Sequence, residues 1–412
     1  MSARRKKVAR KKKKAPARRK VAARKKTARK KTRRKTTTRR GKVLRDELVI
    51  EQITGVAQLL YKTIGKPAQP TLEFPSRTLS NVSYDKRRGY FEIGGQRIVR
   101  KLDYNTVKTF AQTLRFMSLS KELIERNDFA TKRDAYYQSK NWGDAKFKEQ
   151  TESDTVMDDV EALFSLQQVS REELRFFPED HGGAVAGALV VVDQDPETGD
   201  EIEIDCTQFG SGAYTIPSSV EHLKFKTDAK FILAIETGGI FQRLNYHRYW
   251  RSAKCILIEM AGVPTRATRR FIRRLAEHRA PRLPVYAFTD CDPYAFANIY
   301  RTLKVGSGNA AHISRFFCVP HARFLGVTPQ DIIDHKLMDA THKLQPNDIK
   351  RAKDALKNDP FFKAQPKWRK AVRQQLQMGV RAEQQAFAKW DLNYIIDKYL
   401  PKKLRNVKSF LP

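Results

Sequence analysis

The stretch FILAIETGG, at residues 231–239, is the first of three apolar runs that decide the fold of this 412-residue chain. The second run is CILIEMAG at 255–262, and the third is VYAFTDCDPY at 285–294. The segments between them, at 240–250 and 265–278, are each long enough for several helical turns and are apolar on one side. This alternation of strand-like and helix-like segments predicts an α/β fold, in which helices flank a parallel sheet.

Three acidic residues stand at the carboxyl ends of the expected strands. Glu236 ends the first run, and Asp290 and Asp292 end the third, before a proline, Pro293, suited to the first position of a helix. Parallel sheets bind ligands outside the carboxyl ends of their strands, so we expect the carboxylates to meet there and to repel one another unless a cation lies between them. Hard oxygen ligands favour Mg²⁺. The alternative is that Glu236 caps a helix and that the two aspartates belong to an ordinary loop.

The composition bounds the class of protein. With 40% hydrophobic residues, the chain is long enough for two or three domains with apolar cores. No apolar run approaches the roughly 18 residues of a membrane helix, and no apolar segment follows the basic start as it would in a secretory signal. We therefore expect an intracellular protein that does not contact a membrane. The cysteines lack the spacing of a zinc site, and buried thiols are expected for most of them.

The positive charge is unevenly distributed. Residues 1–42 contain 24 Lys and Arg and no acid, and residues 43–412 then carry 57 Lys and Arg against 45 Asp and Glu, a net charge of +12. The first segment has no hydrophobic period, so we expect a disordered basic arm that binds phosphates nonspecifically, acts as a nuclear address, or only keeps the protein soluble. The remaining positive charge indicates a polyanionic partner.

The segment before the apolar runs contains further expected elements. Apolar residues spaced by three and four predict an amphipathic helix over 43–64, which packs either on its own chain or on a partner. Alternating residues over 71–103 predict short strands, and the segments 106–127 and 128–140 read as helices. Short strands beside two basic helices are typical of a winged-helix DNA-binding module.

The segment DFATKRDAYYQSK, at residues 128–140, carries a second candidate chemistry. Asp128 is a candidate cap for a helix that bears Arg133, Tyr136 and Tyr137. A tyrosine hydroxyl that attacks phosphorus forms a covalent ester, which stores the energy of the broken bond. The alternative is that one tyrosine belongs to the core and the other to the surface. No Walker motif is present in the sequence, so we expect any ATP to bind a partner protein.

The helix expected over residues 265–278 displays a row of arginines. They recur at three and four positions, which places them on one side of a helix that leaves the acidic edge of the sheet. Two interpretations remain open: the arginines line a path for DNA, or they form an ordinary solvated face. The residues of this row are Arg266, Arg269, Arg270, Arg273 and Arg274.

Several of these segments together resemble a known family. The runs IETGGIFQRL (235–244), AGVPTRATRRFIRRL (261–275) and PVYAFTDCDPYAF (284–296) resemble the Toprim domain found in the A chain of the type IIB DNA topoisomerase, topoisomerase VI, and in its relative, the meiotic double-strand-break transesterase. The resemblance covers nearly all of the chain after residue 42, since residues 381–404 also resemble the C-terminal helices of that topoisomerase chain. One departure is the run EMAG, which is less Gly-rich than expected and adds Glu259.

The resemblance implies a domain order and a set of functional residues. It implies a basic tail at 1–42, an N-terminal helix at 43–65, a winged-helix domain at 66–160, and a Toprim domain with C-terminal helices at 161–412. The tyrosine motif of the family matches this chain so that Tyr137 is the nucleophile and Arg133 is the motif arginine. Glu236, Asp290 and Asp292 then correspond to the residues that hold Mg²⁺.

The resemblance also implies an assembly and a reaction. Two A subunits form a dimer on double-stranded DNA and join two ATPase B subunits in an A₂B₂ heterotetramer, which passes one duplex through another and so relaxes and decatenates DNA. Such an enzyme works on the nucleoid in the cytoplasm, or in the nucleus of a eukaryote. Three alternatives stay open: a meiotic-type transesterase, a Toprim nuclease that cuts with water, and a noncatalytic architectural DNA-binding protein.

Overall fold

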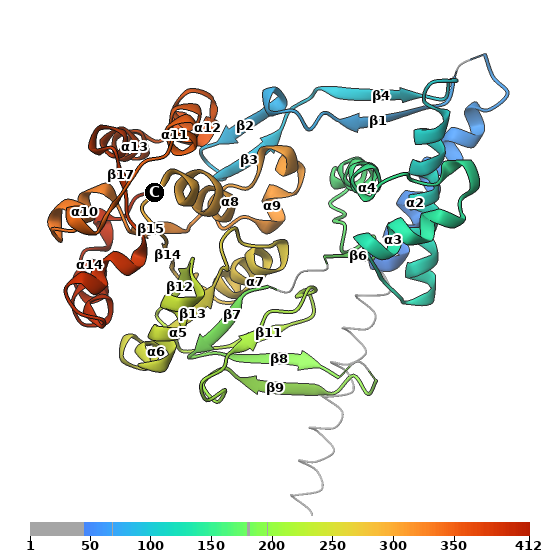
Figure 1. Cartoon of the computed structure of the whole chain (residues 1–412). Coiled ribbons are helices and arrows are strands. Elements are labelled where there is room, and N and C mark those ends of the chain that lie inside the picture. Colours follow the sequence, from blue (N-terminus) through green and yellow to red (C-terminus); the bar gives the residue numbers. More distant parts are fainter. Residues whose placement is uncertain (1–44, 68, 179–181, 196) are drawn as a thin grey trace, which may run out of the picture. The chain divides into compact units, whose positions relative to one another are not determined.

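The computed structural model describes residues 45–67, 69–178, 182–195 and 197–412 (Figure 1). The basic arm expected at residues 1–42 lies outside the described residues. The chain divides into two compact units, Met1–Gln58 and Leu59–Pro412. The first unit is described from residue 45 and is helical, and the helix runs on to residue 63, as the apolar spacing predicts.

A six-stranded sheet forms the centre of the second unit. Its strand order is β10-β7-β13-β12-β14-β15. The pairs β12–β13, β12–β14 and β14–β15 are parallel, which confirms the expected parallel arrangement. β7 and β10 join the edge of the sheet in antiparallel orientation, so the complete sheet is mixed. The strands of this sheet are β7 (Ala184–Gly187), β10 (Tyr214–Thr215), β12 (Phe231–Ile235), β13 (Cys255–Glu259), β14 (Val285–Phe288) and β15 (Arg323–Gly326).

Helices connect the parallel strands. The first connection is not one helix, because Arg248 adopts a left-handed backbone conformation (φ 52°) between α5 (Gly238–Tyr246) and α6 (Tyr249–Ala253). The second connection is α7 (Arg266–Glu277), as expected. Side chains on both faces of these strands are covered, and every residue of β12 and β14 is buried. This explains why the strands appear in the sequence as continuous apolar runs.

The segment from residue 71 to residue 178 contains the expected short strands and helices. Two antiparallel pairs form, β1 with β4 and β2 with β3. Aromatic rings pack between the helices, with Phe116 5.3 Å from Phe147 and 5.8 Å from Phe176 between ring centroids. The elements are β1 (Thr71–Pro75), η1 (Leu79–Asn81), β2 (Val82–Asp85), β3 (Tyr90–Ile93), β4 (Arg97–Lys101), α2 (Val107–Arg126), β5 (Ala130–Thr131), α3 (Lys132–Gln138), η2 (Ser139–Asn141), η3 (Gly143–Ala145), α4 (Gln150–Ser165) and β6 (Phe176–Phe177).

A small antiparallel sheet follows, built from β8 (Val190–Gln194), β9 (Glu201–Asp205) and β11 (Lys224–Lys226). The strands β8 and β9 pair in antiparallel orientation from Val190 opposite Asp205 to Gln194 opposite Glu201.

Helices dominate the chain after β14. A cluster of rings surrounds Trp368, which is fully buried and lies 5.2 Å from Phe296, 5.2 Å from Tyr300 and 5.0 Å from Phe324. The elements are η4 (Ala295–Tyr300), α8 (Arg301–Lys304), η5 (Gly308–Ile313), α9 (Ser314–Phe317), α10 (Pro329–Asp334), η6 (Met338–Ala340), β16 (His342–Lys343), α11 (Pro346–Asn358), α12 (Pro360–Ala364), α13 (Pro366–Met378), β17 (Val380–Arg381), η7 (Gln384–Lys389), η8 (Ile395–Tyr399), α14 (Leu400–Arg405) and η9 (Val407–Ser409).

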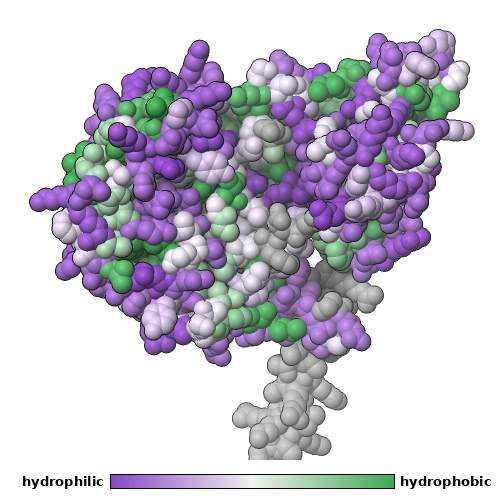
Figure 2. Space-filling model, viewed as in Figure 1, coloured by the Kyte–Doolittle hydropathy of each residue, from purple (hydrophilic) through white to green (hydrophobic). Residues whose placement is uncertain are grey.

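One face of the molecule is mostly polar. On the face seen in Figure 2, hydrophilic residues cover most of the area and hydrophobic residues form small patches among them. Among the described residues, no helix combines the length and the apolar character that crossing a membrane requires. The four cysteines are buried free thiols, as expected: Cys206, Cys255, Cys291 and Cys318.

Candidate active site

The sheet brings the three expected acids to one edge. Glu236 follows β12 directly, and Asp290 comes two residues after the end of the neighbouring strand β14. The backbone N–H of Asp290 donates to Glu236 Oε2 at 2.8 Å, which joins the two strand ends. Glu236 is therefore not a helix cap, since the residue at the cap position of α5 is Thr237. The juxtaposition predicted from the strand order is confirmed.

Asp292 holds the start of the following helix. Its Oδ1 accepts a hydrogen bond of 2.6 Å from the backbone N–H of Ala295, and the chain becomes helical at Pro293. This is the arrangement expected for a proline in the first turn of a helix, with a carboxylate facing the N–H groups that have no partner within the helix. The capping role, considered for Glu236, belongs to Asp292.

Burial and like charges raise the pKa values of these acids. Burial, followed by the charge of Asp290, raises the pKa of Glu236 to about 8. Burial, aided by the charge of Asp292, raises the pKa of Asp290 to about 6, and the hydrogen bond from the backbone of Gln384 partly opposes this rise. Burial likewise raises the pKa of Asp292. Carboxyl groups this close disfavour the charged form of one another, and a cation between them would reverse that effect.

The donor set of the site suits a hydrated hard cation. Glu236 and Asp290 each accept one hydrogen bond, at Oε2 and Oδ1, and within the described residues their second oxygens, Oε1 and Oδ2, accept none. In the described part of the chain, no group of three or more His, Cys, Asp or Glu side chains is arranged to hold a metal ion by itself. Mg²⁺ is commonly held by only one or two carboxylates while it keeps several waters, so the available oxygens fit this ion.

The segment after β17 contributes residues that the sequence did not single out as part of the site. The backbone N–H of Gln384 donates to Asp290 Oδ1 at 2.8 Å, and its side chain donates to the carbonyl of Phe288 at 3.1 Å. The same amide accepts from Thr237 Oγ1 at 3.0 Å. Glu383 raises the pKa of both Glu236 and Asp290 by its charge. The only sequence signal for these residues is the family-like run at 381–404, because they are more than 90 positions from Asp290.

Glu259 also lies at this edge. It ends β13, and burial raises its pKa. A Cβ atom at Gly238 would come within 2.6 Å of Glu259 Oε1, so the glycine leaves room for this carboxylate beside the start of α5. The departure from a more Gly-rich loop thus adds an acid next to the group formed by Glu236 and Asp290.

A short capped helix carries the candidate nucleophile. Thr131 Oγ1 accepts from the backbone N–H of Asp134 at 3.1 Å, and Asp134 Oδ2 accepts from the backbone N–H of Thr131 at 2.9 Å, a capping box at the start of α3. The expectation that Asp128 caps this helix is wrong, because the strand β5 separates them and Asp128 accepts from the N–H of Phe129 instead. Ala135 is buried and anchors the helix.

The two tyrosines of α3 have different surroundings. Tyr136 donates from its hydroxyl to the carbonyl of Lys148 at 3.1 Å and accepts from Lys140 Nζ at 2.8 Å. Tyr137 is 62% exposed, and within the described residues its hydroxyl makes no hydrogen bond. Arg133 lies one turn earlier on the same side of the helix and is also exposed. A difference that the sequence cannot reveal therefore separates the two hydroxyl groups.

The site residues form two groups. Glu236, Asp290 and Asp292 lie together at the sheet edge, whereas Arg133 and Tyr137 lie on α3. Among the described contacts, no hydrogen bond joins Tyr137 to any of the three acids.

The arginines of α7 serve the fold. Arg266 forms ion pairs with Glu161 and Glu172, Arg269 is buried, and Arg270 pairs with Glu221. Arg273 and Arg274 donate to backbone carbonyls, at Cys318 and at Val220 and Leu223. The row is therefore neither the DNA path nor the solvated face that the sequence left open, because its guanidinium groups are used inside the chain.

Family models match three consecutive parts of the chain. The model described as "Type IIB DNA topoisomerase" matches residues 108–175, and "All-beta domain in DNA topoisomerase VI alpha subunit" matches residues 179–229. The model that describes the Toprim domain of the topoisomerase 6 A subunit/Spo11 family matches residues 231–404, which include the acidic edge of the sheet and the segment around Gln384.

Curated relatives match over most of their length. The A subunit of type 2 DNA topoisomerase 6 from Methanocaldococcus jannaschii is 49% identical over 89% of this chain and 97% of its own. Relatives of the same name from Methanosarcina barkeri and Methanothermobacter thermautotrophicus are 36% and 33% identical, each over 89% of this chain and over 97% and 99% of their own.

Proposed function

We propose a function for this chain from the premise that it belongs to the family of topoisomerase VI A subunits. It is a subunit of a type II DNA topoisomerase, and we infer that it is the subunit that cuts DNA. The observation that carries this inference is the exposed Tyr137, whose hydroxyl lacks a partner within the described residues and lies one turn after Arg133 on a capped helix.

The cleavage step is a transesterification. The Tyr137 oxygen forms a bond to a backbone phosphorus as the bond from phosphorus to the 3′ oxygen breaks. The phenol loses its proton to solvent and the departing 3′ oxygen gains one, which leaves a 5′-phosphotyrosyl ester and a free 3′ hydroxyl. The reverse attack by the 3′ hydroxyl restores the strand. Arg133 offsets negative charge on the phosphate through charge-assisted hydrogen bonds.

The acidic edge of the sheet is the proposed metal site. Glu236, Asp290 and Asp292 would hold Mg²⁺, which when bound supplies a Lewis acid that stabilises charge on the phosphate. The chain's own contribution is to orient the ligands: the N–H of Asp290 fixes Glu236, Gln384 fixes Asp290, and the start of the helix at Pro293 fixes Asp292. These contacts fix one oxygen of each carboxylate, and for Glu236 and Asp290 they leave the other to face a ligand.

The proposed assembly follows the family. Residues 66–160 act as a winged-helix domain that presents Tyr137 to duplex DNA, and residues 161–412 act as the Toprim domain with its C-terminal helices. Two such chains form a dimer, in which each tyrosine works with the metal site of the other chain, and two ATPase B subunits complete the A₂B₂ enzyme.

A meiotic-type transesterase is the second candidate, since it cuts by the same chemistry without passing a second duplex. The relatives named above are topoisomerase subunits, which favours the topoisomerase. A Toprim nuclease that cuts with water would need no tyrosine.

Covalent trapping tests the proposal. The full chain is incubated with its ATPase partner, ATP, Mg²⁺ and end-labelled supercoiled DNA, and the reaction is stopped with detergent. We expect protein linked to 5′ ends with the wild type and with Tyr136→Phe, and none with Tyr137→Phe. Free ends produced by Tyr137→Phe would identify a hydrolytic nuclease, and linkage that persists in Tyr137→Phe but disappears in Tyr136→Phe would assign the other tyrosine.

A further inference from the structure

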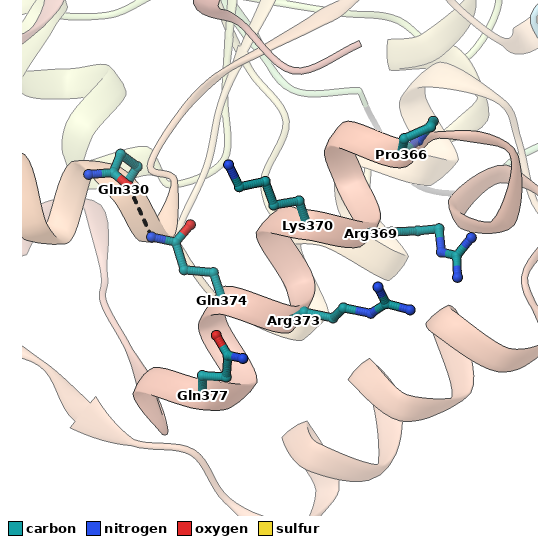
Figure 3. A pocket seen from close by; sticks show the side chains of 7 residues that line it. All are labelled: Gln330, Pro366, Arg369, Lys370, Arg373, Gln374 and Gln377. Atoms are coloured by element: carbon teal, nitrogen blue, oxygen red, sulfur yellow. Dashed lines mark hydrogen bonds between the residues drawn. The ribbon is translucent and has the colours of Figure 1, made fainter.

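A basic groove lies on the C-terminal helices, outside the residues assigned above to cleavage. It has a volume of about 470 Å³ and runs along α13 beside α10. Figure 3 shows Arg369 and Arg373 extending in the same direction from α13, with Lys370 on the side of Gln330. Its lining residues are Gln330, Pro366, Arg369, Lys370, Arg373, Gln374 and Gln377, so it contains three cations, three amides and no carboxylate.

The cations of this groove form no ion pair with any residue that the structure describes. Among the described residues, Arg369, Lys370 and Arg373 form no ion pair, whereas most arginines of α7 do. Arg369 Nε is buried and has no acceptor within hydrogen-bond distance. The amide of Gln374 instead donates to Gln330 Oε1 at 3.0 Å, which ties α13 to α10 across the floor of the groove. Like charges one turn apart on a helix repel one another, so an anion bound between them would relieve the repulsion.

The groove is longer than one small anion. Arg369, Arg373 and Gln377 follow at intervals of four residues, each about 6 Å along the helix axis. A neighbouring pocket shares Gln330, Lys370 and Gln374 and adds the exposed lysines Lys367 and Lys402. Two carboxylates also line this pocket, Asp331, which pairs with Lys403, and Asp334. A repeating row of cations and amides in an open groove suits a polymer of phosphates, whereas an enclosed site would suit a single phosphate.

The end of α13 is tied to the acidic edge of the sheet. Near the C-terminus of the helix, Gln375 Nε2 donates to the carbonyl of Cys291 at 2.8 Å, and Cys291 lies between the two aspartates of that edge. The backbone of Cys291 also pairs with Ala382, just after α13. The helix that carries the groove therefore ends beside the proposed metal site.

From these observations we propose that the groove formed by α10 and α13 binds the sugar-phosphate backbone of duplex DNA that flanks the cleavage site. The inference rests on the proposed function for its ligand, since it assumes that this chain acts on DNA. Arg369 and Arg373 contact phosphates, Lys370 adds a third positive charge, and the amide of Gln377 extends the row towards the cleavage site. The contact is independent of base sequence, because only backbone oxygens are reached.

Salt-dependent binding of the full chain to a labelled blunt duplex tests the groove. The variant Arg369→Gln with Arg373→Gln removes two cations, and the control Lys353→Gln with Lys357→Gln removes two from α11 that do not line the groove. Each phosphate contact contributes about 0.9 to the slope of log affinity against log salt, so we expect the groove variant to lower the slope by about 1.8. Between 50 and 200 mM salt, its affinity should then fall about 12-fold less than that of the wild type.

Further experiments distinguish duplex DNA from a small phosphate anion, and DNA from a protein partner, as the ligand of the groove. Arg369→Lys with Arg373→Lys should keep the wild-type slope, and Lys370 should be protected from amine acylation by the duplex but not by pyrophosphate at equal phosphate concentration. Protection by pyrophosphate alone would identify a small-anion site and overturn the proposal. An unchanged slope for the Gln variant would also overturn it, as would loss of binding to the ATPase partner with DNA binding intact.

The binding assay is independent of cleavage. It is made without Mg²⁺ and repeated in Tyr137→Phe, so its outcome does not depend on which residue is the nucleophile. If the binding assay refutes the groove, the covalent trapping result still holds. If trapping refutes the assignment of Tyr137, the binding result still holds.

Discussion

Arg266 provides the sharpest test of the energetics of this fold. Its guanidinium donates to both oxygens of Glu161, at 2.6 and 3.1 Å, and to both oxygens of Glu172, at 2.9 and 2.8 Å. The side chains are 14%, 2% and 9% exposed, respectively, so almost no water replaces a lost partner. The cluster joins α7, which connects β13 and β14 of the central sheet, to α4 and the turn after it.

The substitution Arg266→Met removes the charge and keeps most of the apolar stem. Breaking a buried ion pair by removing one partner costs about 3–5 kcal/mol, because the remaining charge is buried without compensation. Glu161 then keeps the hydrogen bond of 2.8 Å from the backbone N–H of Arg171, the nearby His312 and the charge of the Arg171 side chain. We therefore expect the free energy of unfolding to fall by about 3–5 kcal/mol.

Arg270, one turn later on the same helix, is the matched control. It also binds one glutamate through two nitrogens, Glu221 at 2.6 and 2.9 Å, but the glutamate is 46% exposed. Exposed ion pairs contribute about 0–1 kcal/mol, so Arg270→Met should lower the free energy of unfolding by no more than about 1 kcal/mol. The pair of variants separates burial from bond geometry.

The cost of Arg266→Met depends on pH. Burial alone would raise the pKa of Glu161, but Arg266, then His312 and Arg171, hold it well below its usual range. A carboxyl whose folded pKa is depressed stabilises the fold above its unfolded pKa of about 4.3 and loses that contribution as the pH falls through the folded value. Arg266→Met removes the largest of these lowering charges, so we expect the pKa of Glu161 in the variant to lie closer to its unfolded value. The difference between wild type and variant should therefore be greatest at neutral pH and shrink below about pH 4.3.

Urea denaturation followed by circular dichroism measures the effect. With a slope of about 3 kcal/mol per molar urea, the Arg266→Met midpoint should move by about 1 M or more, and the Arg270→Met midpoint by about 0.3 M or less. Equal shifts for the two variants would refute the burial argument, as would an Arg266→Met shift that does not decrease in acid.

Three further predictions concern the site and the core. Asp290→Asn and Glu236→Gln should abolish the rise in melting temperature that Mg²⁺ gives the wild type, a binding readout separate from cleavage; an unchanged rise would place the ion elsewhere. Thr131→Ala removes the capping box of α3 and should cost that helix about 0.5–2 kcal/mol, measured as faster amide exchange over α3 with α2 unchanged; equal exchange would show that the cap is dispensable. Trp368→Ala should cost about 3–5 kcal/mol in denaturation experiments, because a fully buried ring is lost, whereas the half-exposed Trp390→Ala should cost much less; similar losses would contradict the assignment of the core.

The central sheet was predictable because its signals are local. Continuous apolar runs mark β12, β13 and β14, and the order of strands and helices fixes their parallel pairing and hence the meeting of Glu236 with Asp290. The break between α5 and α6 was not predictable, because Arg248 adopts a left-handed conformation that no glycine or asparagine announces. The antiparallel edge formed by β7 and β10 was missed for a similar reason, since their pairing depends on distant contacts.

Features that depend on tertiary packing could not be predicted from the sequence. A row of arginines at helical spacing looks the same whether it faces solvent, DNA or buried glutamates, and only the fold brings Glu161 to Arg266. Likewise, Tyr136 and Tyr137 are adjacent in the sequence, and their hydroxyl groups differ because Lys140 and the carbonyl of Lys148 lie next to only one of them. The role of Gln384 at Asp290 depends on a contact across 94 positions.

That contact makes ion binding and the docking of the C-terminal segment reciprocal. The backbone of Gln384 orients Asp290 only while residues 381–384 are seated, so a cation that prefers the oriented carboxylate must stabilise the seated segment by the same free energy. Anything that pulls on the helices after η7, such as a bound protein or a strained duplex, would then change the affinity for the ion without touching a ligand. The C-terminal segment around Gln384 and the ion are thus thermodynamically coupled, although this segment supplies none of the proposed ligands.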